Sequence, residues 1–346
     1  MDTTPVIDYL NNPTPEELGR TPLEFLAKLE KPTLINIRGR DSSRVRVIST
    51  LLHGNEPSGF FAVHRWLCQQ QVPPVSLLFF IGNVAAARLS PTFSQRQLPD
   101  GRDFNRCFKE PFDGPEGKVA EAFLAVLQEI GPEALVDIHN TSGTGPGFVV
   151  SVCNDRRHQA LTALFTERML FTPLRLGSLM EYSENAVPSV TFECGGAQDE
   201  HAHQAAWEGL LRFIDCADPF ALPEADWDIE VLTNPVRVEL VEDVTVAYGE
   251  RPVSGCEVTF RPDIEHFNFG VIGPEIALGQ VGPRGLACFR VVDSEGRNVC
   301  NRVLRLEAGQ LFVAQPIKAF MITSNAEIAK SDCLMYVVTA AGGGFI

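Results

Sequence analysis

Short β-type runs alternate with segments of helical period between residues 46 and 216, and this alternation constrains the fold more than any other feature. The runs are apolar and rich in β-branched or aromatic residues: VRVISTLL, VSLLFFIGN, ALVDIHN, GFVVSVCN and SVTFEC. Four helical segments lie between or after them, Ser58–Gln70, Glu116–Glu129, Arg156–Leu170 and His201–Cys216. This pattern predicts an α/β fold, with a mixed, mostly parallel sheet and helices on both faces. Ligands bind beyond the carboxyl ends of the strands in such sheets.

The pattern changes after Cys216, where a proline-punctuated connector begins. From Trp227 the chain consists of short β-type runs separated by Gly, Pro and Asp turns, and helical period is nearly absent. We therefore expect a first domain over residues 1–217, a linker over 218–226 and a small all-β domain, a sandwich or barrel, over 227–346. The first domain is expected to carry an N-terminal helical extension, because the sequence TPLE from Thr21 has the signals of a helix start.

Charge and composition exclude several classes of partner. The chain has 29 Lys and Arg against 44 Asp and Glu, a net charge of −15, which argues against nucleic acid or an anionic membrane surface as a partner. No apolar run approaches the ~18–20 residues that span a bilayer, and the acidic N-terminus does not resemble a secretory signal. The 9 cysteines include no CxxC pair and fit reduced thiols. We expect a cytoplasmic protein that acts on a small molecule, and the sequence is compatible with a homo-oligomer.

Two of the apolar runs lead to a histidine. His53 and Glu56 lie three residues apart in the turn before a helix, and His139 ends another run. Imidazole nitrogens and carboxylate oxygens are ligands of zinc, and a catalytic zinc site keeps one position open beside three protein ligands. Asp137, two residues before His139 on the same strand face, is placed to accept a hydrogen bond from its ring. Alternatively, His53 caps a strand and Glu56 lies in the positive first turn of the helix. His139 could likewise be a core histidine whose hydrogen bonds are satisfied.

A third run ends at Glu193, followed by two glycines. A partly desolvated carboxylate beside a metal-bound water can take the proton of that water and deliver it to a leaving nitrogen. The alternative is a helix-capping or salt-bridged carboxylate.

Three arginines lie within the eleven residues RQLPDGRDFNR, between the first two candidate ligand segments: Arg96, Arg102 and Arg106. A guanidinium binds a carboxylate through two hydrogen bonds and, when aimed at a carbonyl, stabilises a developing oxyanion. The alternative is a solvated turn with local ion pairs.

Four motifs, in this order, resemble those of the succinylglutamate desuccinylase/aspartoacylase family within the wider zinc-carboxypeptidase-like group: HGNE (53–56), DFNR (103–106), DIHN (137–140) and FECGG (192–196). The later stretches HFNFG and ALGQ resemble segments of that family's C-terminal β-domain. The resemblance implies one Zn2+ per chain, held by His53, Glu56 and His139. It also implies that Glu193 is the general base and acid.

The same resemblance implies that Asn105 and Arg106 bind a substrate carboxylate and that Arg96 faces the oxyanion. Arg102 is a competing assignment, because Arg96 stands further from Asn105 than in the best-known members. The stretch 180–188 contains no arginine where aspartoacylases carry one that binds substrate. A doubly acidic substrate is therefore less favoured than a singly charged one.

Together these features predict a zinc-dependent hydrolase, an amidohydrolase or deacylase. It would cleave the N-acyl amide bond of a small carboxylate-bearing substrate, such as an N-acyl amino acid, with metal-activated water. The alternatives are a carboxypeptidase or esterase on the same zinc site, and a non-catalytic zinc- or ligand-binding module. Glu193 and Arg96 argue against the last of these, because binding alone needs no general base.

Overall fold

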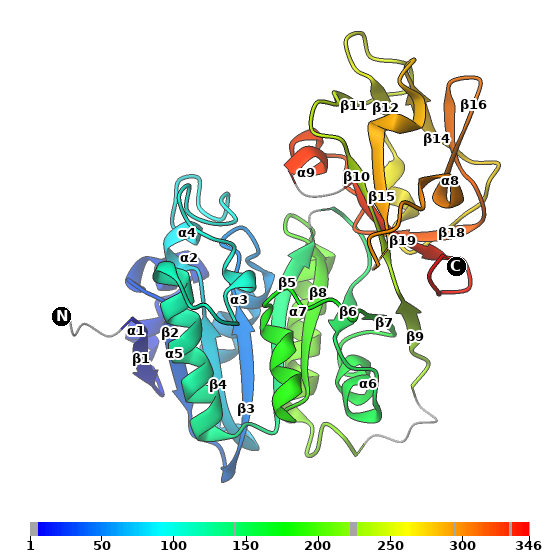
Figure 1. Ribbon diagram of the computed structural model, residues 1–346. Helices are drawn as coiled ribbons and strands as arrows, with labels where there is room; N and C mark the ends of the chain where they lie inside the picture. Colours follow the sequence, from blue (N-terminus) through cyan, green and yellow to red (C-terminus); the bar gives the residue numbers. More distant parts are fainter. Residues whose placement is uncertain (1–5, 142, 222–226, 294, 332–333, 346) are drawn as a thin grey trace. The chain divides into compact units, whose positions relative to one another are not determined.

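The computed structural model describes residues 6–141, 143–221, 227–293, 295–331 and 334–345 (Figure 1). Of the predicted linker over 218–226, residues 222–226 lie outside the described part of the chain. The chain divides into two compact units. The first comprises Met1–Asn140, Gly147–Met169 and Pro173–Ile229; the second comprises Thr141–Pro146, Leu170–Thr172 and Glu230–Ile346.

A nine-stranded mixed sheet has the strand order β1-β2-β4-β3-β5-β8-β6-β7-β9. Its strands are β1 Asp8–Asn11, β2 Thr33–Ile37, β3 Asp41–Thr50, β4 Val75–Ile81, β5 Ala134–Thr141, β6 Phe148–Ser151, β7 Arg168–Phe171, β8 Ser189–Gly196 and β9 Glu230–Thr233. Strand β3 runs parallel to both β4 and β5, whereas β2 is antiparallel to β4 and β6 is antiparallel to β8. The predicted mixed, mostly parallel sheet is confirmed.

Helices cover both faces of this sheet, as predicted (Figure 1). Successive residues of β4 point to opposite faces. Leu77, Phe79 and Ile81 pack with α3 (Ser58–Leu67) and α7 (Glu200–Asp215), while Leu78 and Phe80 pack with α5 (Gly114–Ile130). The helical elements are α1 Pro15–Leu18, α2 Pro22–Lys28, α3 Ser58–Leu67, α4 Val84–Ala87, η1 Phe104–Arg106, α5 Gly114–Ile130, α6 Arg156–Ala163, η2 Leu179–Asn185 and α7 Glu200–Asp215.

One local prediction was wrong. The helix expected over Arg156–Leu170 ends at Ala163, and β7 begins at Arg168. A short apolar run such as RMLF fits a buried strand as well as a helix, so periodicity does not separate the two. The helix predicted after Thr21 is present as α2, and the N-terminal extension also supplies β1 and β2, which were not predicted because their parallel pairing depends on distant partners.

The centre of the sheet places three functional segments side by side. Strands β3 and β5 are parallel neighbours with Thr50 opposite Ile138, so their carboxyl ends lie at the same edge. Strand β8 is the next neighbour of β5. The HxxE pair lies in the turn after β3, while His139 and Glu193 lie in the carboxyl-terminal halves of β5 and β8, respectively.

The second unit contains two five-stranded sheets, ordered β13-β18-β19-β10-β15 and β11-β12-β14-β17-β16. Among the described residues, the strands within these sheets pair antiparallel except β11 with β12, which confirms the predicted all-β character. The strands are β10 Val236–Leu240, β11 Val246–Tyr248, β12 Val258–Phe260, β13 Val271–Ile272, β14 Ala277–Val281, β15 Phe289–Val292, β16 Leu304–Glu307, β17 Gln310–Val313, β18 Ile317–Phe320 and β19 Met335–Thr339. Short helical elements connect them: η4 Ile264–Phe267, η5 Gly285–Cys288, α8 Cys300–Val303 and α9 Ala326–Ser331.

The loop that follows β5 belongs to this second unit. The Glu265 carboxylate accepts hydrogen bonds from the backbone nitrogen and hydroxyl of Thr144, at 3.1 and 2.8 Å. The other oxygen of Glu265 accepts from the backbone nitrogen and hydroxyl of Ser324, at 2.5 and 2.6 Å. Asn268 donates through Nδ2 to the Thr144 carbonyl at 2.5 Å. The loop is therefore held by side chains far from it in the sequence.

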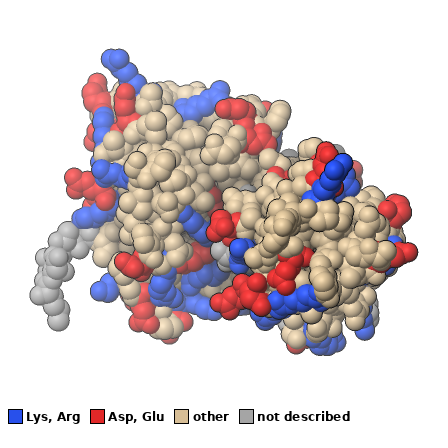
Figure 2. Space-filling view, turned by 90° about the horizontal axis from the view of Figure 1, so that it is seen from above, with Lys and Arg blue, Asp and Glu red and all other residues tan. Residues whose placement is uncertain are grey.

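Acidic and basic side chains are interspersed over the face drawn in Figure 2. Among the described residues, no helix combines the length and the apolar character needed to cross a bilayer.

Candidate metal centre

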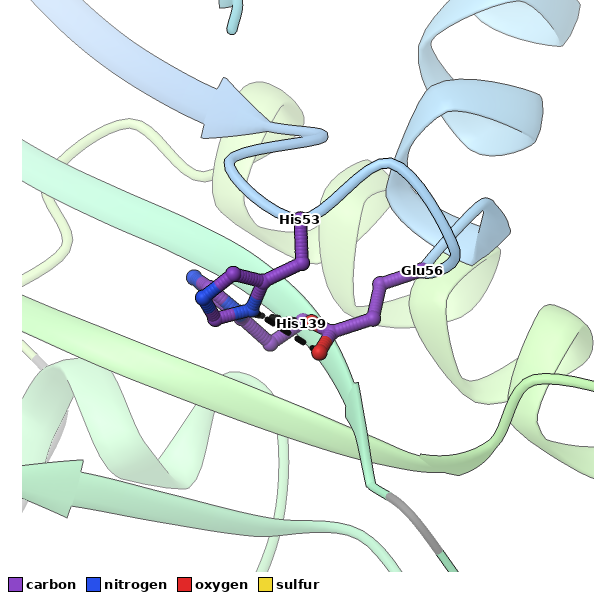
Figure 3. A group of neighbouring side chains, drawn as sticks. All are labelled: His53, Glu56 and His139. Carbon is purple, nitrogen blue, oxygen red and sulfur yellow. Dashed lines mark hydrogen bonds and ion pairs between the residues drawn. The ribbon is translucent and has the colours of Figure 1, made fainter. Parts of the chain in front are cut away.

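His53, Glu56 and His139 converge on one point (Figure 3). The Nδ1 atom of His53 lies 2.8 Å from Glu56 Oε1, and the Nδ1 atom of His139 lies 2.7 Å from Glu56 Oε2. All three residues are buried, and their ligand atoms lie within 4.8 Å of one another. The positions of these residues after two apolar runs of the sequence predict this convergence.

A tight turn brings Glu56 back towards His53. The backbone nitrogen of Glu56 donates to the His53 carbonyl at 3.1 Å. Gly54 lies in this turn, where a Cβ atom would stand 2.5 Å from the Ala87 nitrogen, so only glycine fits. Helix α3 then begins at Ser58.

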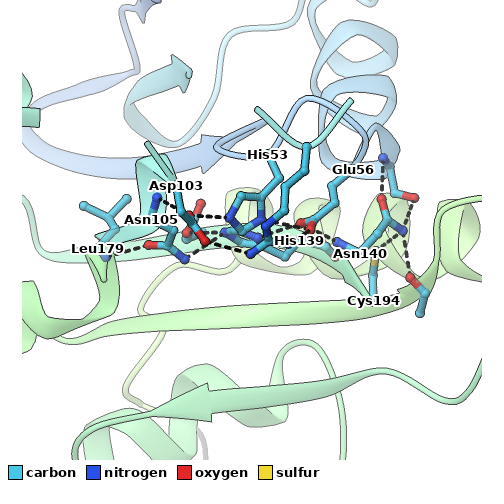
Figure 4. Close-up of polar contacts among 12 residues, drawn as sticks. His53, Glu56, Asp103, Asn105, His139, Asn140, Leu179 and Cys194 are labelled. Atoms are coloured by element: carbon cyan, nitrogen blue, oxygen red, sulfur yellow. Dashed lines mark hydrogen bonds and ion pairs between the residues drawn. The ribbon is translucent and has the colours of Figure 1, made fainter. Parts of the chain in front are cut away.

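The outward ring nitrogens of both histidines face further carboxylates. His139 Nε2 lies 2.6 Å from Asp137 Oδ2, and His53 Nε2 lies 2.9 Å from Asp103 Oδ1 (Figure 4). Such partners orient a metal-binding imidazole and leave its other nitrogen for the metal. Two imidazoles and one carboxylate, buried and held in this way, form a donor set that suits zinc. The sequence predicts the role of Asp137, which shares a strand face with His139, but it does not predict that of Asp103, although Asp103 opens the DFNR motif.

The charges of the centre stabilise its carboxylates in the ionised form. Burial raises the pKa of Glu56, but His53 and His139 outweigh burial and hold this pKa well below its usual range. Burial also raises the pKa of Asp103, and His53 and Arg96 bring it below its usual range.

The pKa of Glu193 shifts in the opposite direction, upwards. Burial raises the pKa of Glu193 to about 7, although His139, His53 and Arg96 act to lower it. Its Oε2 atom is inaccessible and has no hydrogen-bond partner among the described residues. A carboxyl group with this pKa and an unused oxygen is suited to exchange a proton near neutral pH.

The three arginines are placed differently. Arg96 contacts the centre, with Nη1 3.3 Å from Glu56 Oε1 and Nη2 3.0 Å from Asp103 Oδ2. Arg102 donates to the backbone carbonyl of Asp113 at 2.8 Å. Arg106 donates to the carbonyl of its neighbour Asn105 at 2.7 Å.

Asn105 connects the centre to η2. Its Nδ2 atom lies 3.5 Å from His139 Nε2, and its Oδ1 atom accepts from the Leu179 backbone nitrogen at 2.9 Å (Figure 4).

Residues 44–215 match the family model described as the Succinylglutamate desuccinylase/Aspartoacylase catalytic domain. The chain belongs to the succinylglutamate desuccinylase/aspartoacylase family. This desuccinylase/aspartoacylase family member is a zinc-binding hydrolase, as its buried His-Glu-His ligand set and its catalytic-domain match together indicate. No curated protein matches the chain significantly.

Solved structures share the fold of this family member. It resembles a succinylglutamate desuccinylase/aspartoacylase from Rhodobacter sphaeroides with a TM-score of 0.55 at 14% identity, over 88% of this chain and 84% of that one. It also resembles the product-bound ectoine utilization protein from Ruegeria pomeroyi, with a TM-score of 0.53 at 17% identity, over 88% of each chain. A third match is succinylglutamate desuccinylase from Vibrio cholerae, with a TM-score of 0.50 at 15% identity, over 85% of this chain and 98% of that one.

A second group of metal-ligand side chains in this family member has a different character. Cys153, Asp155 and His158 have ligand atoms within 4.8 Å of one another. Asp155 is exposed and caps α6, accepting from the backbone nitrogens of Arg157 and His158. We interpret this group as a helix cap, since the positive end of the helix dipole disfavours a cation there.

Proposed function

We propose that this protein hydrolyses the N-acyl amide bond of a small substrate with one free carboxylate, such as an N-acyl amino acid, and binds one zinc ion per chain. The observation that carries this proposal is the unpartnered, buried Oε2 atom of Glu193 beside the His-Glu-His ligand set. A site that only stored zinc would not need a carboxyl group with a raised pKa there.

His53, Glu56 and His139 would hold the zinc ion. When bound there, zinc lowers the pKa of a coordinated water and polarises a carbonyl oxygen. Asp103 and Asp137 hold the Nε2 atoms of the two imidazole rings, so the Nδ1 atoms would be the ones to bind the ion.

Glu193 is proposed as the group that moves the proton. Its Oε2 atom would accept a proton from the water that attacks the amide carbonyl and would then donate this proton to the nitrogen as the C–N bond breaks. Without this transfer the amine leaves as an anion, which is strongly disfavoured.

Arg96 is proposed to stabilise the negative charge that develops on the carbonyl oxygen, because its guanidinium already contacts Glu56 and Asp103 at the centre. Arg102 is less suited to this role, because it is hydrogen-bonded to Asp113.

Arg106 and Asn105 are proposed to bind the substrate carboxylate. The names of the structural relatives, desuccinylase and aspartoacylase, denote the removal of acyl groups from amino acids, which supports this substrate class. Because residues 180–188 contain no arginine, we propose a singly charged substrate rather than N-acetylaspartate.

A substrate screen on the zinc-loaded protein tests the proposal. It should compare N-acetyl amino acids, N-succinyl amino acids and short peptides, and each N-acyl amino acid with its carboxamide. Loss of the carboxylate should cost at least about 1.5–3 kcal/mol in kcat/KM. Equal rates for acid and carboxamide would contradict the carboxylate clamp. A preference for peptides would indicate a carboxypeptidase, and stoichiometric zinc without any hydrolysis would indicate a binding module.

A further inference from the structure

The side chain of Asn140, the residue after His139, is hydrogen-bonded to two other segments of the first unit (Figure 4). Its Oδ1 atom accepts from the Ser58 backbone nitrogen at 3.0 Å. Its Nδ2 atom donates to Ser58 Oγ and to the Gly195 carbonyl, each at 2.8 Å, and lies 3.3 Å from Cys194 Sγ. Asn140 is 3% exposed, so this buried carboxamide is fully satisfied by protein groups.

Each segment held by Asn140 also supplies a group of the centre. Ser58 begins α3 two residues after Glu56, and Gly195 lies in β8 two residues after Glu193. One carboxamide therefore ties together the ends of β5 and β8 and the start of α3.

Two further hydrogen bonds reach the ligands directly. The backbone nitrogen of Asn140 donates to Glu56 Oε2 at 3.2 Å. The Cys194 thiol donates to the His139 carbonyl at 2.9 Å. A displacement of Asn140 or Cys194 would therefore move Glu56 or His139, because a hydrogen bond joins each of these pairs.

The network continues outwards to helix α7. Ser58 Oγ lies 2.6 Å from His203 Nδ1. Ser58 Oγ has two lone pairs, so the tautomer of the His203 ring decides whether Ser58 donates its hydrogen to Nδ1 or accepts a hydrogen from it. The His203 ring also packs against Phe61 with a centroid distance of 5.2 Å and an interplanar angle of 70°. His203 is only partly buried, so its side chain can be changed at less cost than Asn140 or Ser58.

We propose that Asn140, Ser58 and His203 are positioning residues, which hold the segments of Glu56, His139 and Glu193 in the one arrangement that retains zinc and transfers protons. This inference rests on the proposed function of the centre. His203 is the outermost member, and its role is to fix the Ser58 hydroxyl.

The test compares His203→Leu with His203→Asn. Leucine removes the ring nitrogen that is hydrogen-bonded to Ser58, so zinc release to an excess of chelator should become about tenfold faster and kcat should fall about tenfold with little change in KM, as for other groups that hold metal ligands in place. Asparagine places a carboxamide, which can donate or accept a hydrogen bond, close to the Nδ1 position and should recover most of both values. A role limited to filling space would not be recovered by asparagine, which is smaller than leucine and polar.

His201→Leu is the matched control. His201 is exposed on the same turn of α7, so the same substitution there should leave zinc release and kcat at wild-type values. Ser58→Ala is a second variant, which removes the hydroxyl from the inner side and should reproduce the His203→Leu effect. Thermal unfolding of the metal-free proteins identifies any variant that does not fold.

The outcomes separate the two proposals. If His203→Leu and Ser58→Ala release zinc and turn over substrate like the wild type, the positioning role is overturned and the proposed function stands. If the wild type retains zinc but hydrolyses no N-acyl amino acid, the proposed function fails, and the rates of zinc release still decide the positioning role. If the wild type binds no zinc through His53, both proposals are overturned.

Discussion

In each histidine of the centre, both ring nitrogens lie within hydrogen-bond distance of a carboxylate oxygen. Glu56 lies between the two rings, while Asp103 and Asp137 hold their outer edges. We expect His53→Ala and His139→Ala to lose most bound zinc, because the donor set has three protein ligands and each substitution removes one of them. Metal analysis of the purified proteins measures this loss. His201→Ala should keep its zinc, and equal retention in all three variants would refute the ligand assignment.

Glu193 is expected to act on protons without binding the metal. Glu193→Gln should therefore retain zinc and lose activity by about 10²–10⁴-fold, the range of positioned proton transfer. The glutamine keeps the size of the side chain and removes the exchangeable proton. Metal content and kcat measured on one preparation test this prediction, and near-normal turnover would assign Glu193 a structural role.

Arg96 and Arg106 should affect different kinetic constants. Arg96→Ala should lower kcat more than it raises KM, because an oxyanion contact forms only in the transition state. Arg106→Ala should mainly raise KM, because a substrate carboxylate is bound before and during reaction. Arg102→Ala should have the smallest effect, given its bond to Asp113. Steady-state kinetics of the three variants would reveal an exchange of roles.

At the scale of secondary-structure elements, hydrogen bonds to the Glu265 carboxylate hold the loop that follows β5 in place. Burial raises the pKa of Glu265, but hydrogen bonds from Ser324 and Thr144 outweigh burial and lower it. A lowered pKa in the folded state means that this contribution to stability is present above the unfolded pKa of about 4.5 and is lost as the pH falls through the folded value.

We therefore expect Glu265→Gln to destabilise the second unit by about 1–2 kcal/mol at neutral pH, the loss of charged hydrogen bonds at a partly exposed site. The difference from the wild type should shrink as the pH falls below about 4.5. Urea unfolding at several pH values measures this, and a difference that stays constant with pH would show that the Glu265 charge does not contribute.

The strand ends of the first unit were predictable from the sequence because their signals are local. An apolar run that stops at His139 or Glu193 marks a buried strand and the polar group at its edge. Strand β7 and the pairing of β1 with β2 were not predictable, because short runs acquire their identity from partners far away in the chain. The contact of His203 with Ser58 spans 145 positions, and a single sequence carries no signal for such a pair.

For the whole molecule, zinc is expected to act as a ligand of the folded state. Because the donor set exists only when β3 and β5 are paired, zinc at 100 times its Kd should stabilise the protein by about 2.7 kcal/mol. Calorimetry with and without a chelator should show a lower Tm for the metal-free protein, and the Tm of His53→Ala should not respond to zinc. A Tm of the wild type that is independent of zinc would contradict a folded-state site.

The assignment of Thr141–Pro146 and Leu170–Thr172 to the second unit has a consequence for how such a chain can be recombined. The two units are interleaved along the polypeptide, so a single crossover near residue 230 would transfer Glu265 and Asn268 without the loop they bind. Exchange between relatives would preserve these contacts only if the loop and its partners were inherited together. A single gene fusion could therefore neither add nor remove the complete second unit. We expect this unit to have evolved together with the segments around His139.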